Sequence, residues 1–487
     1  MKRLTSLGDV SGPAKLPGYD PQSHGRGIVH LGIGAFHRAH QAVMTDTALA
    51  AQGGDWRITG ISLRAKDVAQ TMNPQNGLYT LIERGADGTS ARVIAAVRDV
   101  IAADPAATLT AMLEPLVRIV TLTVTEKGYG IDRSTRDADP SHPAVISDLA
   151  DPKHPSGVLG LLTEALRLRR EAGTSPFTVL CCDNLPENGT LLRDGVTGFA
   201  RRIDPALAEW IAANVAFPSS MVDRITPAAT PESLAEAQRQ IGCIDLAAVE
   251  TEPFLQWVIE DHFPTGRPAW EAAGALFVTD VAPYERMKLT MLNGSHSMLA
   301  YAGFLSGRKY VRDVMADPAL AALVARHQMA AAQVLPPLPG IDLSAYSNAL
   351  QKRFRNPAIA HETFQIAMDG TEKLPQRIFQ PAMVALEHGQ DLRPFAFATA
   401  AWMRYAMGVT DEGTPYALRD PREAEIRAVL TPVQREGAPV SQAMLDLPSF
   451  MPRPLRENPE WRRLTGEILS VMIFNGMTEA IRREAQA

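Results

Sequence analysis

Short apolar runs alternate with amphipathic stretches through the first part of the chain, and this alternation limits the folds that it can adopt. Five runs have the length and composition of buried strands, at residues 27–31, 56–63, 91–97, 119–124 and 177–182. Intervening stretches such as residues 158–170 carry the apolar spacing of a helix. The pattern predicts a mostly parallel sheet covered by helices on both faces, with ligand chemistry at the carboxyl ends of the strands.

A glycine-rich turn follows the first of these runs. Gly32 and Gly34 stand between the expected strand and a helix-like segment at residues 35–44. A strand, a tight turn and a helix in this order are typical of a dinucleotide-binding unit, although Ala35 and Phe36 come next and the third glycine of the usual fingerprint is missing. We expect Gly32, Gly34, Ala35 and Phe36 to contact such a cofactor.

The residues after the second run bear on which dinucleotide binds. An acidic residue at the end of that strand would hold the ribose hydroxyls of NAD, but the chain places Arg64 first and Asp67 only later. Arg64 could instead meet the 2′-phosphate of NADP. The residues alone leave both cofactors open.

From about residue 283 the pattern changes to long helical segments separated by proline-rich loops. The apolar spacing predicts helices at residues 287–304, 318–333, 381–387, 394–407 and 459–483. We therefore predict an α/β fold in two parts. A Rossmann-type, mostly parallel sheet domain at residues 1–282 binds the cofactor, and a largely α-helical domain at residues 283–487 carries substrate binding and catalysis.

The composition excludes several classes of partner. Forty-eight basic and 54 acidic residues give a net charge of -6 without a long run of either sign, so neither nucleic acid nor an anionic membrane is an expected partner. No apolar run is long enough for a signal peptide or a membrane span. We expect a small-molecule substrate and, because no interface pattern is readable, a monomer or a weak homo-oligomer.

The metal-binding residue types are sparse. The three cysteines, Cys181, Cys182 and Cys243, form neither a disulfide framework nor a zinc motif, and they fit a reducing cytoplasm. His37 and His40 are three residues apart and could share an ion, but no carboxylate or thiolate has matching spacing. We expect no metal and a cytoplasmic protein.

Three polar residues, Lys288, Asn293 and His296, interrupt an otherwise apolar segment that should be helical. At about 100° per residue, Asn293 lies roughly 140° and His296 roughly 80° around the helix from Lys288, so the three can face one cavity. A base, an amide and an imidazole are what metal-free oxidation of a secondary alcohol requires. The alternative is that each residue only caps or solvates the helix.

Other polar residues follow predicted strands or interrupt apolar ones. Asn184 ends one strand and could donate to a substrate oxygen or open an Asx turn. Glu126 and Lys127 follow another strand and form either a solvated pair or part of a substrate site. Asp223 is followed by Arg224 among apolar residues, so either the two pair structurally or Asp223 meets substrate hydroxyls while Arg224 holds it in place.

Lys373 and Arg377 lie together on a predicted turn. Their point charge and planar fork suit a carboxylate ligand, and the alternative is a solvated turn.

Taken together, these residues resemble the long-chain polyol and hexuronate dehydrogenases, a family that includes mannitol 2-dehydrogenase and fructuronate reductase. The resemblance spans nearly the whole chain and lies in the blocks Ile28–Gln41, Thr123–Tyr129, Cys182–Asn184, Met221–Ile225 and Lys288–His296. It implies a metal-independent enzyme that uses NAD, with a Rossmann-type domain and a helical C-terminal domain. A dinucleotide-binding regulator that keeps the fold without the chemistry is the alternative class.

The resemblance also implies roles for individual residues. Lys288 is then the general base, and Asn184 and Asn293 bind the reacting oxygen. Asp223 and His296 contact substrate hydroxyls, and Glu285, just before the lysine, takes part in proton passage.

Two segments resemble the hexuronate branch of the family more than the mannitol branch. These are Glu126–Tyr129 and Lys373–Arg377, whose added cations suit a sugar that ends in a carboxylate. We therefore expect interconversion of D-fructuronate and D-mannonate, with Glu126, Lys127, Lys373 and Arg377 as substrate-binding residues. Oxidation of mannitol or of a related polyol such as D-arabinitol is the alternative.

Overall fold

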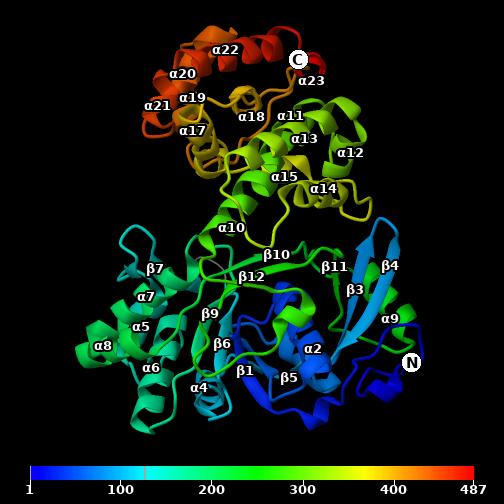
Figure 1. Cartoon of the computed structure of the whole chain (residues 1–487), viewed down its shortest axis with the longest axis vertical. Coiled ribbons are helices and arrows are strands. Elements are labelled where there is room, and N and C mark those ends of the chain that lie inside the picture. Colours follow the sequence, from blue (N-terminus) through cyan, green and yellow to red (C-terminus); the bar gives the residue numbers. More distant parts are fainter. Residues whose placement is uncertain (1, 125–127) are drawn as a thin grey trace. The chain divides into compact units, whose positions relative to one another are not determined.

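The computed structural model describes residues 2–124 and 128–487. The chain divides into two compact units, Met1–Ala282 and Pro283–Ala487, which we call the first and second units (Figure 1). Among the described residues the strands lie in the first unit, and the second unit is helical, which confirms the predicted fold class.

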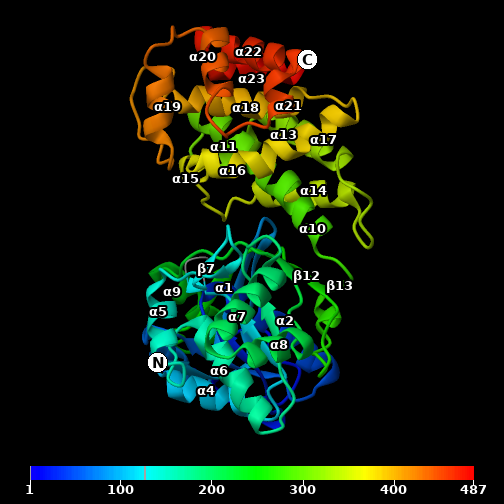
Figure 2. The same cartoon turned by 90° about the vertical axis from the view of Figure 1, so that its left-hand side faces the viewer.

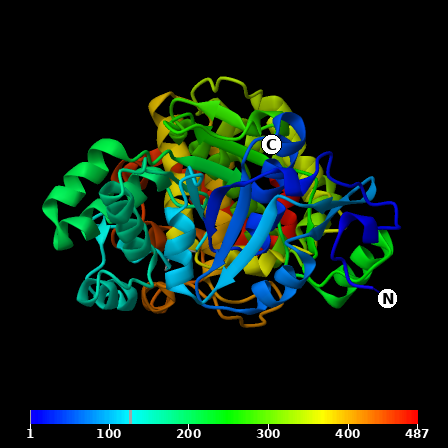
Figure 3. The ribbon, with the colours of Figure 1, turned by 90° about the horizontal axis from the view of Figure 1, so that it is seen from below.

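A five-stranded parallel sheet forms the centre of the first unit. Its order is β5-β2-β1-β6-β9, and every neighbouring pair is parallel. The strands are β1 (Arg26–Leu31), β2 (Arg57–Ser62), β5 (Val97–Ala102), β6 (Ile119–Leu122) and β9 (Thr178–Cys181). Figure 3 shows the blue and cyan strands side by side. From β1 the chain adds β2 and β5 on one side and then β6 and β9 on the other. Ligands of such sheets bind at the carboxyl ends of the strands where this change occurs, here between β1 and β6.

Helices cover both faces of this sheet, as the alternating pattern predicts. One apolar core contains residues of α4, α6 and α7, and the other contains residues of α2 and α3. The helices of the first unit are α1 (Ala35–Ala39), α2 (Gln41–Gln52), α3 (Asp67–Met72), α4 (Pro105–Leu113), α5 (Pro143–Ala150), α6 (Val158–Glu171), α7 (Asn188–Ile203), α8 (Pro205–Asn214) and α9 (Pro231–Ile241). The segment at residues 35–44, expected as one helix, is broken at His40 between α1 and α2.

The prediction for residues 91–97 was wrong in one respect. They contribute to β4 (Gly88–Ile94), which pairs antiparallel with β3 (Tyr79–Gly85) in a separate sheet that β11 (Val249–Thr251) completes. The next residues form β5 at the edge of the main sheet. The remaining strands are β10 (Ser220–Asp223), β12 (Gln256–Glu260) and β13 (Leu276–Val278) in a third sheet, and β7 (Ile131–Asp132) with β8 (Asp137–Ala138).

The second unit packs its helices around a core that includes α11, α13, α18 and α22, and Figure 2 shows α18 and α22 side by side. Its helices are α10 (Ala282–Met287), α11 (Ser295–Leu305), α12 (Val311–Ala316), α13 (Pro318–Gln333), α14 (Leu343–Phe354), α15 (Thr363–Ala367), α16 (Gly370–Leu374), α17 (Gln380–Glu387), α18 (Arg393–Ala406), α19 (Glu423–Leu430), α20 (Gly437–Leu445), α21 (Arg453–Glu457), α22 (Pro459–Phe474) and α23 (Met477–Gln486). The helix expected at residues 459–483 is divided between α22 and α23.

Candidate active site

The glycine turn lies at the carboxyl end of β1. Gly32 has a φ of 93°, and a Cβ there would lie 2.1 Å from the Thr123 carbonyl oxygen of the neighbouring strand end, so only glycine fits. A Cβ on Gly34 would meet only the Gly32 carbonyl oxygen, at 3.9 Å, which leaves that backbone open. Ala35 and Phe36 are partly exposed beside it. This turn carries no side chains, and it lies where the strand order changes direction. Both features suit the pyrophosphate of a dinucleotide.

Two buried histidines support the turn. The rings of His30 and His37 stack with centroids 3.4 Å apart. The His30 ring nitrogens contact Thr121 Oγ1 at 2.8 Å and Thr123 Oγ1 at 2.9 Å. Burial lowers the pKa of His30 to about 3 and that of His37 well below its usual value, so both imidazoles are neutral.

The histidine pair considered for a metal does not form a metal site in this structure. His40 Nε2 lies 2.9 Å from the Gln256 carbonyl oxygen, while His37 stacks on His30. Over residues 2–124 and 128–487, no three side chains of His, Cys, Asp or Glu gather in a way that could hold a metal ion.

The residues expected at the ribose are exposed. Arg64 follows β2, and Asp67 is the first residue of α3. Their exposure leaves both side chains accessible to a ligand.

Asp183 fixes the backbone before Asn184. Its carboxylate accepts hydrogen bonds from the Val124 backbone N–H at 2.8 Å and from the Tyr129 hydroxyl at 2.6 Å. The ends of β6 and β9 are therefore joined just before the exposed Asn184. Glu126 and Lys127 lie outside the described residues.

Asp223 is the last residue of β10 and is 7% exposed. Its neighbour Arg224 pairs with Glu83, so the structural pairing considered for this segment involves a residue from β3.

The lysine segment is helical, but its winding differs from the expected α-helix. Between α10 and α11, residues Lys288–Gly294 form a π-helix, which we call the first π segment. A π-helix bonds residue i to residue i+5, so Asn293 stands one turn after Lys288 and the estimate of 100° per residue does not hold here. π-Helical turns are rare and concentrate at functional sites. Glu285 lies in α10, partly exposed.

The His296 imidazole is surrounded by aromatic rings and cations. It stacks on Phe354 with centroids 4.5 Å apart and meets the His361 ring edge-on at 5.5 Å. Burial, followed by the charges of His361, Arg353 and Arg377, holds its pKa well below the usual value. Lys288 and His296 are each 9% exposed, so both are largely removed from water.

Arg377 lies in a second π segment, Pro375–Phe379. Its Nη1 is 3.3 Å from Ser297 Oγ and 3.5 Å from the Asn293 carbonyl oxygen. A Cβ on Gly294 would lie 2.9 Å from the Arg377 carbonyl oxygen, so the two π segments pack directly against each other.

Lys373 donates to the Met368 carbonyl oxygen at 2.6 Å and lies 3.7 Å from Asp369 Oδ2. Burial and the charge of Arg377 lower the pKa of Lys373, and burial lowers that of Arg377. The charge of Lys373 also contributes to a lowered pKa of His361.

The second unit thus groups Asn293, His296, Lys373 and Arg377, all expected from the sequence. Arg353 and His361 join them but were not expected, because nothing in their local sequence marks them.

The comparisons with known proteins cover both units. Residues 26–272 match the model of the mannitol dehydrogenase Rossmann domain, and residues 280–463 match that of the mannitol dehydrogenase C-terminal domain. The chain belongs to the mannitol dehydrogenase family. Members of this family are oxidoreductases that act on secondary alcohols, and this family member is an enzyme of that class.

The names of similar proteins point to different sugar substrates. The D-mannonate oxidoreductase of Escherichia coli is 42% identical over 94% of this chain and 95% of its own. A substrate-free D-sorbitol dehydrogenase is 34% identical, covers 99% of this chain and 100% of its own, and superposes with a TM-score of 0.92. Pseudomonas fluorescens mannitol 2-dehydrogenase, solved with NAD and D-mannitol, is 36% identical over 100% and 99%, with a TM-score of 0.81.

No helix in the described part of this family member combines the length and the apolar character needed to cross a bilayer.

Proposed function

We propose that this enzyme interconverts D-fructuronate and D-mannonate with NAD as cosubstrate. The observation that carries the proposal is that two arginines, Arg353 and Arg377, lie near His296, with Lys373 near Arg377. Arg353, Arg377 and His361 all act on the pKa of this histidine, and Lys373 acts on that of His361. The D-mannonate oxidoreductase relative, 42% identical over nearly the full length of both chains, supports the same substrate.

Arg377 supplies the strongest argument for a carboxylate. Its hydrogen bonds go to a backbone carbonyl and a hydroxyl, both neutral, and no carboxylate of the described residues lies within ion-pair distance of it. A guanidinium that loses water without gaining an anion is costly to maintain. The carboxylate of a sugar acid would offset that cost through two parallel hydrogen bonds, which a hydroxymethyl group cannot supply.

The glycine turn supports NAD as the cofactor. Gly32 accepts only a hydrogen at Cα, and the open backbone of Gly34 together with partly exposed Ala35 and Phe36 fits a pyrophosphate and its riboses. When bound, NAD supplies the hydride acceptor or donor. The P. fluorescens relative was solved with NAD, and we propose NAD over NADP on this ground.

Within this proposal, Lys288 exchanges the hydroxyl proton as general acid and base. The amides of Asn293 and Asn184 donate to the reacting oxygen and stabilise its negative charge. Neutral His296 and the Asp223 carboxylate hold substrate hydroxyls, and Glu285 passes the proton onward. The lowered pKa of His296 keeps its ring neutral, so it can accept as well as donate.

A neutral polyol is the second candidate, because the solved P. fluorescens relative holds D-mannitol. The shared family fold and the neutral imidazole of His296 suit hydroxyl binding in either case. The choice between the two substrates therefore depends on whether the Arg377 guanidinium binds a carboxylate of the substrate.

The test compares substrates and one substitution. Wild-type protein is assayed at 340 nm with D-mannonate, D-altronate, D-mannitol, D-arabinitol and D-sorbitol. We expect D-mannonate to give the highest kcat/KM, and Arg377→Met to raise its KM by about 30-fold or more while changing kcat for neutral polyols little.

Arg453→Met is the matched control, because Arg453 is an exposed arginine of the same unit that pairs with Glu457. It should leave all constants unchanged. Highest activity on D-mannitol, or an equal effect of Arg377→Met on acid and polyol, would overturn the sugar-acid assignment. No activity with any substrate of this panel would also overturn the sugar-acid assignment.

A further inference from the structure

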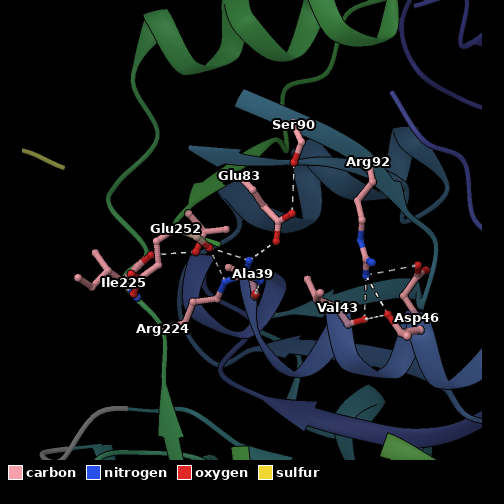
Figure 4. Close-up of polar contacts among 11 residues, drawn as sticks. Ala39, Val43, Asp46, Glu83, Ser90, Arg92, Arg224, Ile225 and Glu252 are labelled. Atoms are coloured by element: carbon pink, nitrogen blue, oxygen red, sulfur yellow. Dashed lines mark hydrogen bonds and ion pairs between the residues drawn. The ribbon is translucent and has the colours of Figure 1, made fainter. Parts of the chain in front are cut away.

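Arg224 joins three separate segments of the first unit. Its side chain has no exposed surface. Nη1 donates to the Ala39 carbonyl oxygen at 2.6 Å, Nε and Nη2 donate to the Glu252 carbonyl oxygen at 3.0 and 2.8 Å, and Nη2 also pairs with Glu83 (Figure 4). The guanidinium therefore links the end of α1, strand β3 and the residue after β11.

The backbone on the far side of Arg224 is fixed as well. Ile225 donates its backbone N–H to Glu252 Oε1 at 2.7 Å and accepts a hydrogen bond from Thr251 Oγ1 at 2.8 Å. On the near side, Asp223 pairs with Gln256 in the β10–β12 ladder. Arg224 thus lies in a stretch of backbone held at both ends, and its charge is matched by Glu83 within that framework.

The contact with Ala39 concerns the glycine turn. Ala39 is the last residue of α1, the short helix that begins directly after Gly34. The final carbonyls of a helix lack partners within the helix and carry partial negative charge, so a buried cation there both bonds and stabilises them. Arg224 therefore holds the helix that follows the proposed cofactor turn.

The contact between Arg224 and Glu83 of β3 bears on the position of Asp223, the residue before Arg224. Asp223 is the last residue of β10, and Arg224 follows it directly. Because the Arg224 guanidinium is held by Glu83 and by the end of α1, the backbone that leaves Asp223 is fixed there. One guanidinium consequently anchors both the chain at Asp223 and the position of α1.

We propose that Arg224 is a positioning residue that holds the Asp223 carboxylate in register with the glycine turn. It acts through Asp223 and α1 and does not touch the substrate itself. The inference rests on the proposed function in one respect, namely that Asp223 binds a substrate hydroxyl.

The test uses substitutions that keep the charge or the shape. Arg224→Lys retains the cation but loses the fork that reaches Ala39 and Glu252 together, and Glu83→Gln retains an acceptor but removes the partner charge. Arg92→Lys is the matched control, because Arg92 donates to the Val43 carbonyl oxygen at 3.0 Å and Thr47 Oγ1 at 3.2 Å from the same sheet as Glu83, without touching α1 or β10 (Figure 4).

We expect Arg224→Lys to raise the KM for D-mannonate about tenfold and to weaken NADH binding, followed by protein fluorescence, severalfold. Glu83→Gln should cause the same changes to a smaller extent. Arg92→Lys should lower the thermal midpoint without changing either constant.

A double-mutant cycle separates positioning from stability. In an Asp223→Ala background, Arg224→Lys should add little further increase in KM, because the group through which it acts is gone. Additive effects on KM, or a lowered thermal midpoint with unchanged KM and NADH affinity, would overturn the proposal.

The inference and the proposed function fail in different ways. If the enzyme prefers another sugar, the cycle is run with that sugar, and the sugar-acid assignment fails while Arg224 is still tested. If no sugar reacts, NADH affinity decides: equal affinities in Arg224→Lys and Arg92→Lys would overturn the proposal, and a selective loss in Arg224→Lys would support it.

Discussion

The two units bury positive charge in different ways. In the first unit, Arg169 is 2% exposed, and its guanidinium donates to the carbonyl oxygens of Ser175, Met112, Glu114 and Val117. In the second unit, the Arg377 guanidinium reaches one carbonyl oxygen and one hydroxyl, at 3.5 and 3.3 Å, beside the cationic Lys373.

The difference in partners separates an arginine that stabilises the fold from an arginine that is suited to bind a ligand. Arg169 ties the end of α4 to the loops before β6 and β9, and its removal would leave several buried carbonyl oxygens without donors. Arg377 is desolvated next to a like charge, which costs stability and is found where a site must receive an anion. Arg169 is buried and Arg377 partly buried, and the two also differ in the number and charge of their partners.

The largest expected effect concerns the buried lysine of the second unit. Lys288→Met keeps the length of the side chain but removes the proton acceptor, so kcat should fall about 1,000-fold. NADH affinity and the thermal midpoint should stay close to the wild-type values. Stopped-flow absorbance at 340 nm measures kcat, and differential scanning calorimetry measures the thermal midpoint.

An undiminished kcat at any pH would remove Lys288 from the mechanism. A collapse of the thermal midpoint would show instead that this lysine, like Arg169, serves the fold.

The next effect tests the comparison of the two arginines directly. Arg169→Met should lower the free energy of unfolding by about 3 kcal/mol, because it leaves buried carbonyl oxygens without donors. Arg377→Met should change it by less than about 1 kcal/mol, because the loss of weak contacts is balanced by removal of a desolvated cation. Urea unfolding followed by tryptophan fluorescence gives both values, and equal destabilisation would refute the distinction.

The smallest effect concerns pH. His327 lies beside the first π segment, 1% exposed, and burial lowers its pKa to about 4. In the unfolded chain this histidine has a pKa of about 6.5. The stability that neutral His327 contributes is therefore complete above pH 6.5 and is lost as the pH falls toward 4. His327→Gln should reduce the loss of unfolding free energy between pH 6.5 and 5 by about 2 kcal/mol.

Urea titrations at the two pH values measure this difference, with His154→Gln as the control. His154 is an exposed histidine of the first unit, so its replacement should leave the pH dependence unchanged. A wild-type pH dependence in His327→Gln would show that this ring is protonated in the folded state.

The sequence predicted the main sheet because its strands are short apolar runs separated by amphipathic helices. It failed for residues 91–97, since an apolar run identifies a strand but not the sheet that it joins. Asp87 and Gly88 at the β3–β4 turn are a hairpin signal that could have corrected this. The break at His40 has no comparable signal, because the backbone there departs from helical geometry without a proline or glycine.

Part of the candidate site was readable for a simple reason. Lys288, Asn293 and His296 are conspicuous because polar residues in an apolar helix need partners. The π winding was not readable, since it depends on packing against the second π segment. Arg353 and His361 were missed because their approach to His296 is made by the tertiary fold, from a helix and a loop distant in sequence.

The contact between the two π segments has a consequence for how the enzyme can change over evolution. Each segment contains a wider turn than an α-helix, and Gly294 of one rests on the backbone of Arg377 in the other. Deleting a single residue from either would restore ordinary winding and change the spacing of the side chains and carbonyls that the wide turn carries. Length is therefore more tightly constrained than residue type in these two segments, so insertions and deletions in this unit should be confined to its loops.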